Sequence, residues 1–319
     1  MTRPPALILT AGLGTRLRPL TDLRAKAAVP VNGEPLACRA ARWLARLGFT
    51  NQVFNLHHHP ASVTAVLGDG ASLGVRIRYS WENPVLGSAG GPRHALPLLT
   101  DGGAMSFLIV NGDTLTDVDV DALLERHVRA GARVTMALIP NPAPAKYGGV
   151  TVDTDGFVTG FTRRGSASPS YHFIGVQVVE AAAFADLPDR VPYESVGALY
   201  PLLIEQDHRS VAAFVSDAAF SDIGTPSDYL HTSLELAARE GDRLWSETAQ
   251  VASGALVQRS ALWDHVQVGR AAHVTESIVG DGVRIPEGST FTRCSIVPAG
   301  TRPPHPDERV ENGLLIRLL

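Results

Sequence analysis

Apolar residues recur every six positions near the C-terminus, and this spacing constrains the fold more than any other feature of the sequence. They are Leu256, Leu262, Val268 and Val274, followed after a small offset by Val279, Ile285 and Phe291. This period is typical of a parallel β-helix, here expected to be left-handed and to span residues 250–300. The alternative is an irregular β segment. So short a β-helix needs a surface to stack on, either the rest of the chain or a second subunit.

The part of the chain before this repeat alternates apolar strands with amphipathic helices. Strands are expected at residues 7–9, 52–56, 75–79, 106–110 and 134–139. One helix is expected from Pro35 to just before Gly48. Another is expected from Pro226, with Thr225 as its N-cap and Asp228 at the capping-box position. This rhythm predicts an α/β fold, with a doubly wound, mostly parallel sheet of the Rossmann-like kind.

We expect three parts in chain order. They are an α/β domain over residues 1–240, the β-helix over 250–300 and a tail over 301–319. Residues 301–312 of this tail are proline-rich and charged, and we expect them to be loosely held. Within the first part, residues 147–179 are rich in glycine and β-branched residues. This stretch is expected to add strands that form a lid or a substrate-side subdomain.

Composition excludes several classes of partner. The 319 residues are 45% hydrophobic and 19% charged, with a formal net charge of −4. Such a balance shows no basic surface for nucleic acid. No segment has the length of a membrane span or the apolar region of a secretory signal, so we expect no membrane partner and a cytoplasmic location. Cys38 and Cys294 are isolated, which argues against disulfides and cysteine zinc sites.

A glycine-rich loop follows the first strand directly. It reads Ala11-Gly12-Leu13-Gly14-Thr15-Arg16. Glycines after a strand let backbone N–H groups approach phosphate oxygens closely. Arg16 and the downstream Lys26 add positive charge. Leu17 stands where a dinucleotide-binding fingerprint has its third glycine, and no Gly-Lys-Ser/Thr follows as in a P-loop.

Two aspartates, Asp113 and Asp222, stand in loops beside the expected strands and helices. Asp113 follows the strand at residues 106–110, and carboxylates at this edge of a parallel sheet face the ligand crevice. Asp222 stands in the sequence Ser-Asp-Ile-Gly-Thr-Pro. Two carboxylates with bridging phosphate oxygens suit Mg²⁺. The alternatives are a turn or helix cap at Asp113 and a second N-cap at Asp222.

These motifs resemble those of the sugar nucleotidyltransferase family, whose signature is G-x-G-T-R-L-x-P-L-T followed by P-K and P-V. Residues 12–21, Lys26 and the Pro30-Val31 pair match it. Two positions depart from it. Ala25 replaces the proline before the lysine, and Glu34 stands where the family has a cation.

The resemblance implies transfer of a nucleotidyl group from a nucleoside triphosphate to a sugar 1-phosphate, with release of pyrophosphate. It implies catalytic roles for Arg16, Lys26 and Asp113, and Mg²⁺ held by Asp113 and Asp222. The residues expected to bind the nucleotide are Ala11, Gly12, Gly14, Thr15, Arg16, Glu82, Gly87 and Ser88.

The segment Glu82 to Gly91 resembles the family's E/Q-x-x-P-L-G-T-A-G motif, which approaches the base and ribose. Glu82 falls where the family often reads the base edge. A carboxylate only accepts hydrogen bonds, so it suits the N1–H and amine of guanine, whereas glutamine suits thymine or uracil. We therefore expect GTP.

The sugar side carries a weaker resemblance. Tyr147 and Gly148 match the family's Y-G-V strand, and Arg164 stands where a lysine holds the sugar phosphate. Arg163 replaces the glutamate that contacts sugar hydroxyls, so sugar recognition is expected to differ. Gly175 and Glu194 complete the sugar-phosphate side.

The expected substrates are GTP with mannose 1-phosphate or a related hexose or heptose phosphate, as in the mannose-1-phosphate guanylyltransferase-like members of the family. Two alternatives remain open. One is a UTP- or dTTP-dependent enzyme acting on another hexose phosphate, and the other is a non-catalytic subunit that binds nucleotide sugars. We also expect a homo-oligomer, with the β-helix as a contact between subunits.

Overall fold

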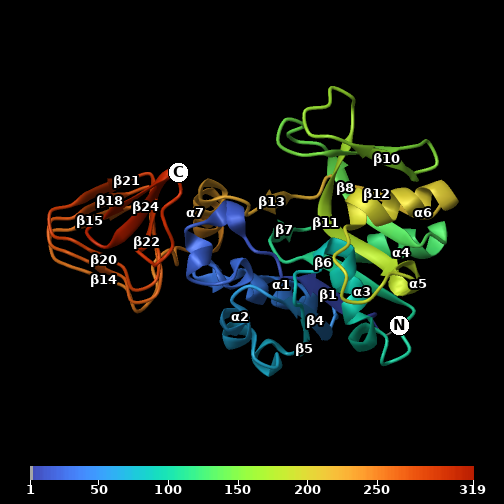
Figure 1. The fold of residues 1–319 in the computed structure, drawn as a ribbon, viewed down its shortest axis with the longest axis horizontal. Helices are drawn as coiled ribbons and strands as arrows, with labels where there is room; N and C mark the ends of the chain where they lie inside the picture. The colour runs from blue at the N-terminus through green and yellow to red at the C-terminus, as the bar shows by residue number, and fades with distance from the viewer. Residues whose placement is uncertain (1–2) are drawn as a thin grey trace. The chain divides into compact units, whose positions relative to one another are not determined.

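The chain folds into two compact units that are interleaved in sequence. The computed structural model, drawn in Figure 1, describes residues 3–319. Unit 1 comprises the residues up to Gly12, then Ala40–Pro60 and Leu67–Ser221. Unit 2 comprises Leu13–Arg39, Ala61–Val66 and Asp222–Leu319. The expected boundaries follow the chain in order, whereas these units divide the glycine-rich loop after Gly12.

A nine-stranded sheet forms the centre of unit 1. Its strands are β1 (Ala6–Leu9), β4 (Asn51–Leu56), β5 (Arg76–Trp81), β6 (Ser106–Asn111), β8 (Val134–Pro140), β9 (Gly149–Val152), β10 (Val158–Thr162), β11 (Tyr171–Glu180) and β12 (Val211–Val215). The run β6-β1-β4-β5 is parallel throughout, and β12 is parallel to β8. Only β11 and the β9–β10 pair run antiparallel to their neighbours. The mostly parallel, doubly wound sheet is therefore confirmed.

Helices pack on this sheet through apolar faces. The α-helices of the chain are α1 (Leu36–Arg46), α2 (Pro60–Leu67), α3 (Gly87–Leu99), α4 (Val120–Ala130), α5 (Ala182–Ala185), α6 (Tyr200–Gln206) and α7 (Pro226–Glu240). In unit 1, α3 packs against β1, β4 and β5, and α4 packs against β8, β11 and β12. The core between them contains fully buried side chains such as Leu7, Val53 and Leu138. This burial supplies the main driving force for the fold.

The strands expected between residues 147 and 179 form the other end of the sheet. Strand β10 pairs antiparallel with β9, and Tyr171 of β11 pairs with Val150 of β9. These strands position Tyr147, Gly148 and Gly175, which lie on or beside them.

In unit 2, helix α7 starts with the predicted capping box. Thr225 Oγ1 accepts a hydrogen bond from Asp228 N at 3.1 Å, and Thr225 N donates to Asp228 Oδ2 at 3.0 Å. The pair β2 (Pro30–Val31) and β3 (Glu34–Pro35) lies nearby, with β2 against α7. No helix among residues 3–319 is both long enough and apolar enough to span a membrane.

The C-terminal part of unit 2 is a parallel β-helix, drawn in orange and red in Figure 1. Its three sheets are β14 (Gln250–Val251), β17 (Gln267–Val268) and β20 (Arg284–Ile285); β15 (Leu256–Gln258), β18 (His273–Thr275) and β21 (Thr290–Thr292); and β16 (Ala261–Leu262), β19 (Ile278–Val279) and β22 (Cys294–Pro298). Each coil advances by 17 residues, as Gln250, Gln267 and Arg284 stack in register.

The 17-residue coil explains the offset in the repeat and corrects one of its members. Two steps of six and one of five complete a coil, so the apolar spacing shortens once per turn. Leu256 is 41% exposed and does not belong to the inward ladder. Its neighbour Val257 stacks on Val274 and packs against the core of the β-helix.

The expectation of a loosely held stretch up to residue 312 is wrong for residues 308–311, and the tail is ordered over residues 308–318. They form β23 (Glu308–Glu311) and β24 (Leu314–Leu318), and β24 pairs antiparallel with β22. The run Leu314, Leu315 and Ile316 is buried against the β-helix. This burial outweighs the charged, proline-rich character of the preceding residues, which suggested a loosely held end.

Candidate active site

The glycine-rich loop begins where β1 ends, and Asn55 of the neighbouring strand holds that point. Asn55 Oδ1 accepts hydrogen bonds from Thr10 N at 2.6 Å and from Ala11 N at 3.3 Å. A methyl group built on Gly12 meets no atom of the described residues within 4 Å. The Gly12 backbone is therefore open to close approach by a ligand.

Gly14 brings Lys26 against the loop. Its φ of 62° lies in the left-handed region, and a methyl group on it would lie 2.8 Å from Thr21 Cγ2 and 3.3 Å from Lys26 Cβ. Thr21 Oγ1 also donates a hydrogen bond to Gly14 O at 2.9 Å. Glycine is required here both by the backbone angle and by the close packing. Thr15 and Arg16 follow as exposed residues of a short 3₁₀ turn, η1 (Thr15–Leu17).

Arg16 and Asp222 both approach Gly224 closely. A methyl group built on Gly224 would lie 3.0 Å from Arg16 Nη1 and 3.0 Å from Asp222 Oδ2. Asp222 is the last residue of β13 (Phe220–Asp222). Unit 2 thus gathers two of the predicted site residues, a cation and a carboxylate, around one buried glycine.

Asp113 lies in unit 1, beside the end of β1. Gly112 N donates to Leu9 O at 3.0 Å, and half-buried Asp113 follows, just before β7 (Thr114–Thr116). Among residues 3–319 no group of three or more His, Cys, Asp or Glu side chains is arranged to hold a metal ion. Asp113 lies in unit 1 and Asp222 in unit 2. Each offers a carboxylate, a donor type that fits Mg²⁺, because Mg²⁺ keeps several waters and takes few protein ligands.

Glu82 is buried in unit 1, and this corrects its expected role. It is 5% exposed, and both carboxylate oxygens already accept hydrogen bonds from the protein. Asn55 Nδ2 donates to Oε1 at 2.7 Å, and Leu86 N donates to Oε2 at 2.8 Å. A side chain committed in this way does not present its carboxylate to a base edge. It ties β5 to the segment that starts α3.

Gly91, on the first turns of α3, allows α3 to lie close to the Glu82 and Asn55 side chains. A methyl group on Gly91 would lie 2.6 Å from Glu82 Oε1 and 2.9 Å from Asn55 Nδ2. Burial raises the pKa of Glu82 above its ordinary value, while the hydrogen bonds from Leu86 and Asn55 oppose that rise. The carboxylate, Asn55 and the start of the glycine-rich loop form one connected set of buried hydrogen bonds, here called the Glu82 network.

Glu194 contacts the residues expected to bind the nucleotide. Ser88 Oγ donates to Glu194 Oε2 at 2.7 Å, and a methyl group on Gly87 would lie 2.8 Å from Glu194 Oε1. Ser195 N donates to Ser88 Oγ at 2.8 Å. The structure therefore brings Gly87, Ser88 and Glu194 together.

The expected sugar side contains a small aromatic cluster. The Tyr147 ring centroid lies 4.2 Å from that of His172, and the Phe220 ring lies 4.8 Å from His172. Burial lowers the pKa of His172 to about 4, so its ring is neutral at pH 7. Arg164 is exposed in the turn after β10, and Gly175 in β11 has a φ of 79°.

The sequence analysis missed two residues of the candidate site, Asn55 in β4 and His172 in β11. Asn55 carried a detectable signal, because it is a polar residue at the carboxyl end of the apolar strand β4. His172 carried none, because a histidine in a mixed strand is common and only the packing of Tyr147 and Phe220 distinguishes it.

A mostly parallel α/β sheet with a glycine-rich loop after β1 and charged residues around it is the arrangement expected of a transferase that binds phosphate groups. Two family models match the chain: nucleotidyl transferase over residues 5–239, and a GlmU-like C-terminal hexapeptide over residues 241–295. The chain therefore belongs to the nucleotidyl transferase family, and its resemblance to the sugar-1-phosphate nucleotidyltransferases is confirmed. The hexapeptide match also confirms a left-handed β-helix.

Curated relatives cover most of the chain. Mannose-1-phosphate guanylyltransferase of Mycobacterium tuberculosis is 28% identical over 90% of this chain and 83% of its own length. UTP–glucose-1-phosphate uridylyltransferase of Synechocystis is 26% identical over 88% and 76%. N-acetylmuramate alpha-1-phosphate uridylyltransferase of Neisseria meningitidis is 35% identical over 69% and 93%.

A solved structure shares the fold. HddC from Yersinia pseudotuberculosis superposes with a TM-score of 0.64 at 22% identity, covering 73% of this chain and 99% of its own. At this identity the likeness concerns the fold alone.

Proposed function

We propose that this protein transfers a nucleotidyl group from GTP to mannose 1-phosphate or a related hexose or heptose 1-phosphate, releasing pyrophosphate. One observation carries the proposal. Lys26 packs on Gly14 of the glycine-rich loop, and Arg16 and Asp222 both lie close to Gly224 in the same unit. The chain belongs to the nucleotidyl transferase family, whose reaction develops negative charge on phosphate groups that such cations stabilise.

In the proposed reaction, an oxygen of the sugar phosphate attacks the α-phosphorus of the triphosphate in line. A new P–O bond forms there, and the bond from the α-phosphorus to the bridging oxygen breaks, its electron pair leaving with pyrophosphate. Lys26 and Arg16 stabilise the negative charge that gathers on the leaving group. The exposed Arg164 binds the sugar phosphate as a charge-assisted anchor.

Asp113 and Asp222 would hold Mg²⁺. When bound, the ion supplies charge neutralisation at the phosphate oxygens. Each carboxylate adds negative charge to that of a triphosphate, and a divalent cation offsets this charge.

The preference for GTP rests on the relatives and no longer on Glu82. Guanylyltransferases are among the matched proteins over nine-tenths of this chain. Uridylyltransferases also match, so UTP with another hexose phosphate is the second candidate. Glu82 acts in this proposal by shaping the segment before Gly87, through the hydrogen bond that it accepts from Leu86.

The test is pyrophosphate release from four nucleoside triphosphates, each with a panel of sugar 1-phosphates and Mg²⁺. We expect the highest kcat/KM for GTP with a manno-configured sugar phosphate. Without Mg²⁺ we expect no pyrophosphate release from any substrate pair. If UTP were preferred across the panel, the base assignment would be wrong. Binding of nucleotide sugars without any pyrophosphate release would instead identify a non-catalytic subunit.

A further inference from the structure

Two aspartates stack on consecutive coils of the β-helix. Asp264 and Asp281 hold equivalent positions, because Leu262 pairs in register with Val279 two residues before each of them. Like charges stacked in this way repel unless a cation lies between them. The sequence of the β-helix therefore carries a site for a positive partner.

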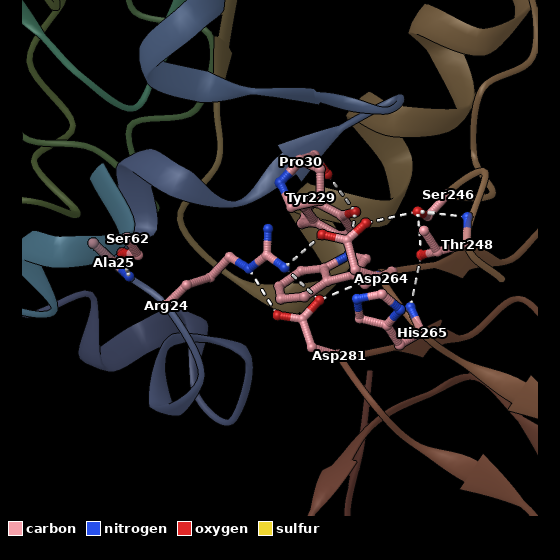
Figure 2. Close-up of polar contacts among 11 residues, drawn as sticks. Arg24, Ala25, Pro30, Ser62, Tyr229, Ser246, Thr248, Asp264, His265 and Asp281 are labelled. Carbon is pink, nitrogen blue, oxygen red and sulfur yellow. Dashed lines mark hydrogen bonds and ion pairs between the residues drawn. The ribbon is translucent and has the colours of Figure 1, made fainter. Parts of the chain in front are cut away.

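Arg24 is that partner, as Figure 2 shows. Its Nε donates to Asp281 Oδ2 at 2.8 Å, and its Nη2 contacts Asp281 Oδ1 and donates to Asp264 Oδ2 at 3.1 Å. The guanidinium also lies 5.1 Å from the centroid of the Trp263 ring. We call Arg24, Asp264 and Asp281 the Arg24 clamp. A bidentate arginine–carboxylate pair fixes both distance and orientation.

A second attachment follows six residues later. Trp263 Nε1 donates to Tyr229 Oη at 2.9 Å, and Tyr229 Oη donates to Pro30 O at 2.6 Å. Trp263 and Tyr229 are fully buried, so this chain of hydrogen bonds is shielded from water. Figure 2 shows Tyr229 and Pro30 beside the Arg24 clamp.

Close packing adds a third attachment. A methyl group on Gly280 would lie 2.6 Å from Leu23 Cδ1, so this coil packs closely against the Leu23 side chain. On the other side of the segment, Ser62 Oγ accepts a hydrogen bond from Ala25 N at 3.0 Å. Attachments at residues 23, 24 and 25 on one side and 30 on the other therefore bracket Lys26.

We propose that the β-helix holds the Lys26 segment in place through the Arg24 clamp, which makes Arg24, Asp264 and Asp281 positioning residues for nucleotidyl transfer. The clamp residues touch one another and leave phosphate binding to Lys26 and Arg16. This inference rests on the proposed function of Lys26. It gives the β-helix a task inside one chain, in addition to the subunit contact expected from its length.

The physical reason is the sensitivity of in-line transfer to position. A shift of about 1 Å in a group that stabilises the transition state lowers the rate by about 100-fold. A relaxed clamp lets the segment sample several positions, so kcat falls while each substrate still binds through its other contacts.

The test compares Asp281→Asn with a matched variant, Glu276→Gln. Glu276 forms an ion pair with Arg259 on the β-helix at 3.3 Å and has no part in the clamp. For Asp281→Asn we expect kcat to fall by about tenfold with KM for both substrates within about twofold. Glu276→Gln keeps wild-type kcat. Thermal unfolding of both variants checks that the loss does not come from unfolded protein.

Conservative replacement provides a second readout. Arg24→Lys keeps the charge without the bidentate contact and should retain more kcat than Arg24→Met. Arg24→Met and Asp281→Asn combined should lose no more than the worse single variant, because each breaks the same contact. If Asp281→Asn keeps wild-type kcat, or if Glu276→Gln loses as much, the clamp has no positioning role.

Failure of the proposed function gives a different pattern. In that case the wild-type chain releases no pyrophosphate with any substrate pair. Failure of the clamp inference alone leaves an active wild type, an impaired Lys26→Ala and a fully active Asp281→Asn.

Discussion

The Glu82 network holds the start of the glycine-rich loop, and the Arg24 clamp holds the Lys26 segment. The two sets of contacts differ in how far they are exposed to solvent. Glu82 and Asn55 are 5% and 3% exposed, and their contacts are short hydrogen bonds within unit 1. The Asp264 and Asp281 side chains of the clamp are 50% and 28% exposed, and their contacts to Arg24 are ion pairs within unit 2.

This difference predicts two kinds of sensitivity. A buried hydrogen-bonded group that loses its partner costs about 1–3 kcal/mol, so the network should respond to small changes in shape. Partly exposed ion pairs are screened by water and salt, so the clamp should contribute modestly to stability. Its effect should fall on the geometry of Lys26 more than on unfolding.

The largest effect is expected at the segment that the clamp holds. Lys26→Ala should lower kcat by at least ~100-fold, because a transition-state contact in a preorganised site is worth about that much. Steady-state pyrophosphate release measures it, with Glu276→Gln as the surface control. Near-normal turnover of Lys26→Ala would remove this side chain from the mechanism.

The next effect concerns the shape of the Glu82 network. Gly91→Ala places a methyl group against Glu82 and Asn55 and should lower the free energy of unfolding by roughly 1–3 kcal/mol. Gly102→Ala is the matched control, because a methyl group there meets no described atom within 4 Å. Urea unfolding compares the two. If Gly91→Ala and Gly102→Ala were equally stable, the Glu82 network would tolerate the added methyl group and this prediction would be wrong.

A smaller effect follows from the titration of Glu82. Its pKa is raised by burial above the ordinary 4.5, so the folded state binds this proton more tightly than the unfolded state. The contribution of Glu82 to stability is full below pH 4.5 and is lost as pH rises through the folded-state pKa. Glu82→Gln lacks this titration.

Urea unfolding from pH 4 upward should therefore show the wild type losing stability relative to Glu82→Gln within that window. Glu276→Gln, which replaces an exposed carboxylate, controls for the loss of one negative charge. Parallel pH profiles of wild type and Glu82→Gln would contradict the raised pKa.

The smallest expected effect is a difference in salt dependence between the Arg24 clamp and the Glu82 network. Raising ionic strength from about 0.1 M to about 1 M shortens the screening length from ~10 Å to ~3 Å. The coupling energy of Arg24 with Asp281, measured by a double-mutant cycle in unfolding, should fall by about 0.5 kcal/mol. The coupling of Asn55 with Glu82 should stay constant, because water does not reach it. Equal salt dependence would erase the contrast between the regions.

Local sequence patterns predicted the elements that depend on neighbouring residues. The capping box of Thr225 and Asp228, the strand before Gly12 and the apolar ladder of the β-helix all rest on contacts within a few residues or one coil. The ladder failed only at Leu256, since a 17-residue coil shifts the inward position to Val257.

The side-chain direction of Glu82 could not be predicted in the same way. A glutamate at the end of β5 can face a ligand or the interior, and the choice depends on Asn55, which lies 27 residues away in sequence. The tail was also misjudged, because the strand β24 is stable only when Leu315 and Ile316 meet the β-helix.

The sequence by itself determined the transferase family, the order of strands and helices, and which residues carry the charges of the glycine-rich loop. Only the tertiary structure decided which of those charges act on ligands and which hold the chain. Arg24 and Lys26 stand two residues apart, yet Arg24 meets two aspartates more than two hundred residues later. Such pairings depend on how coils and loops far apart in sequence pack together, so they cannot be predicted from the spacing of residues along the chain.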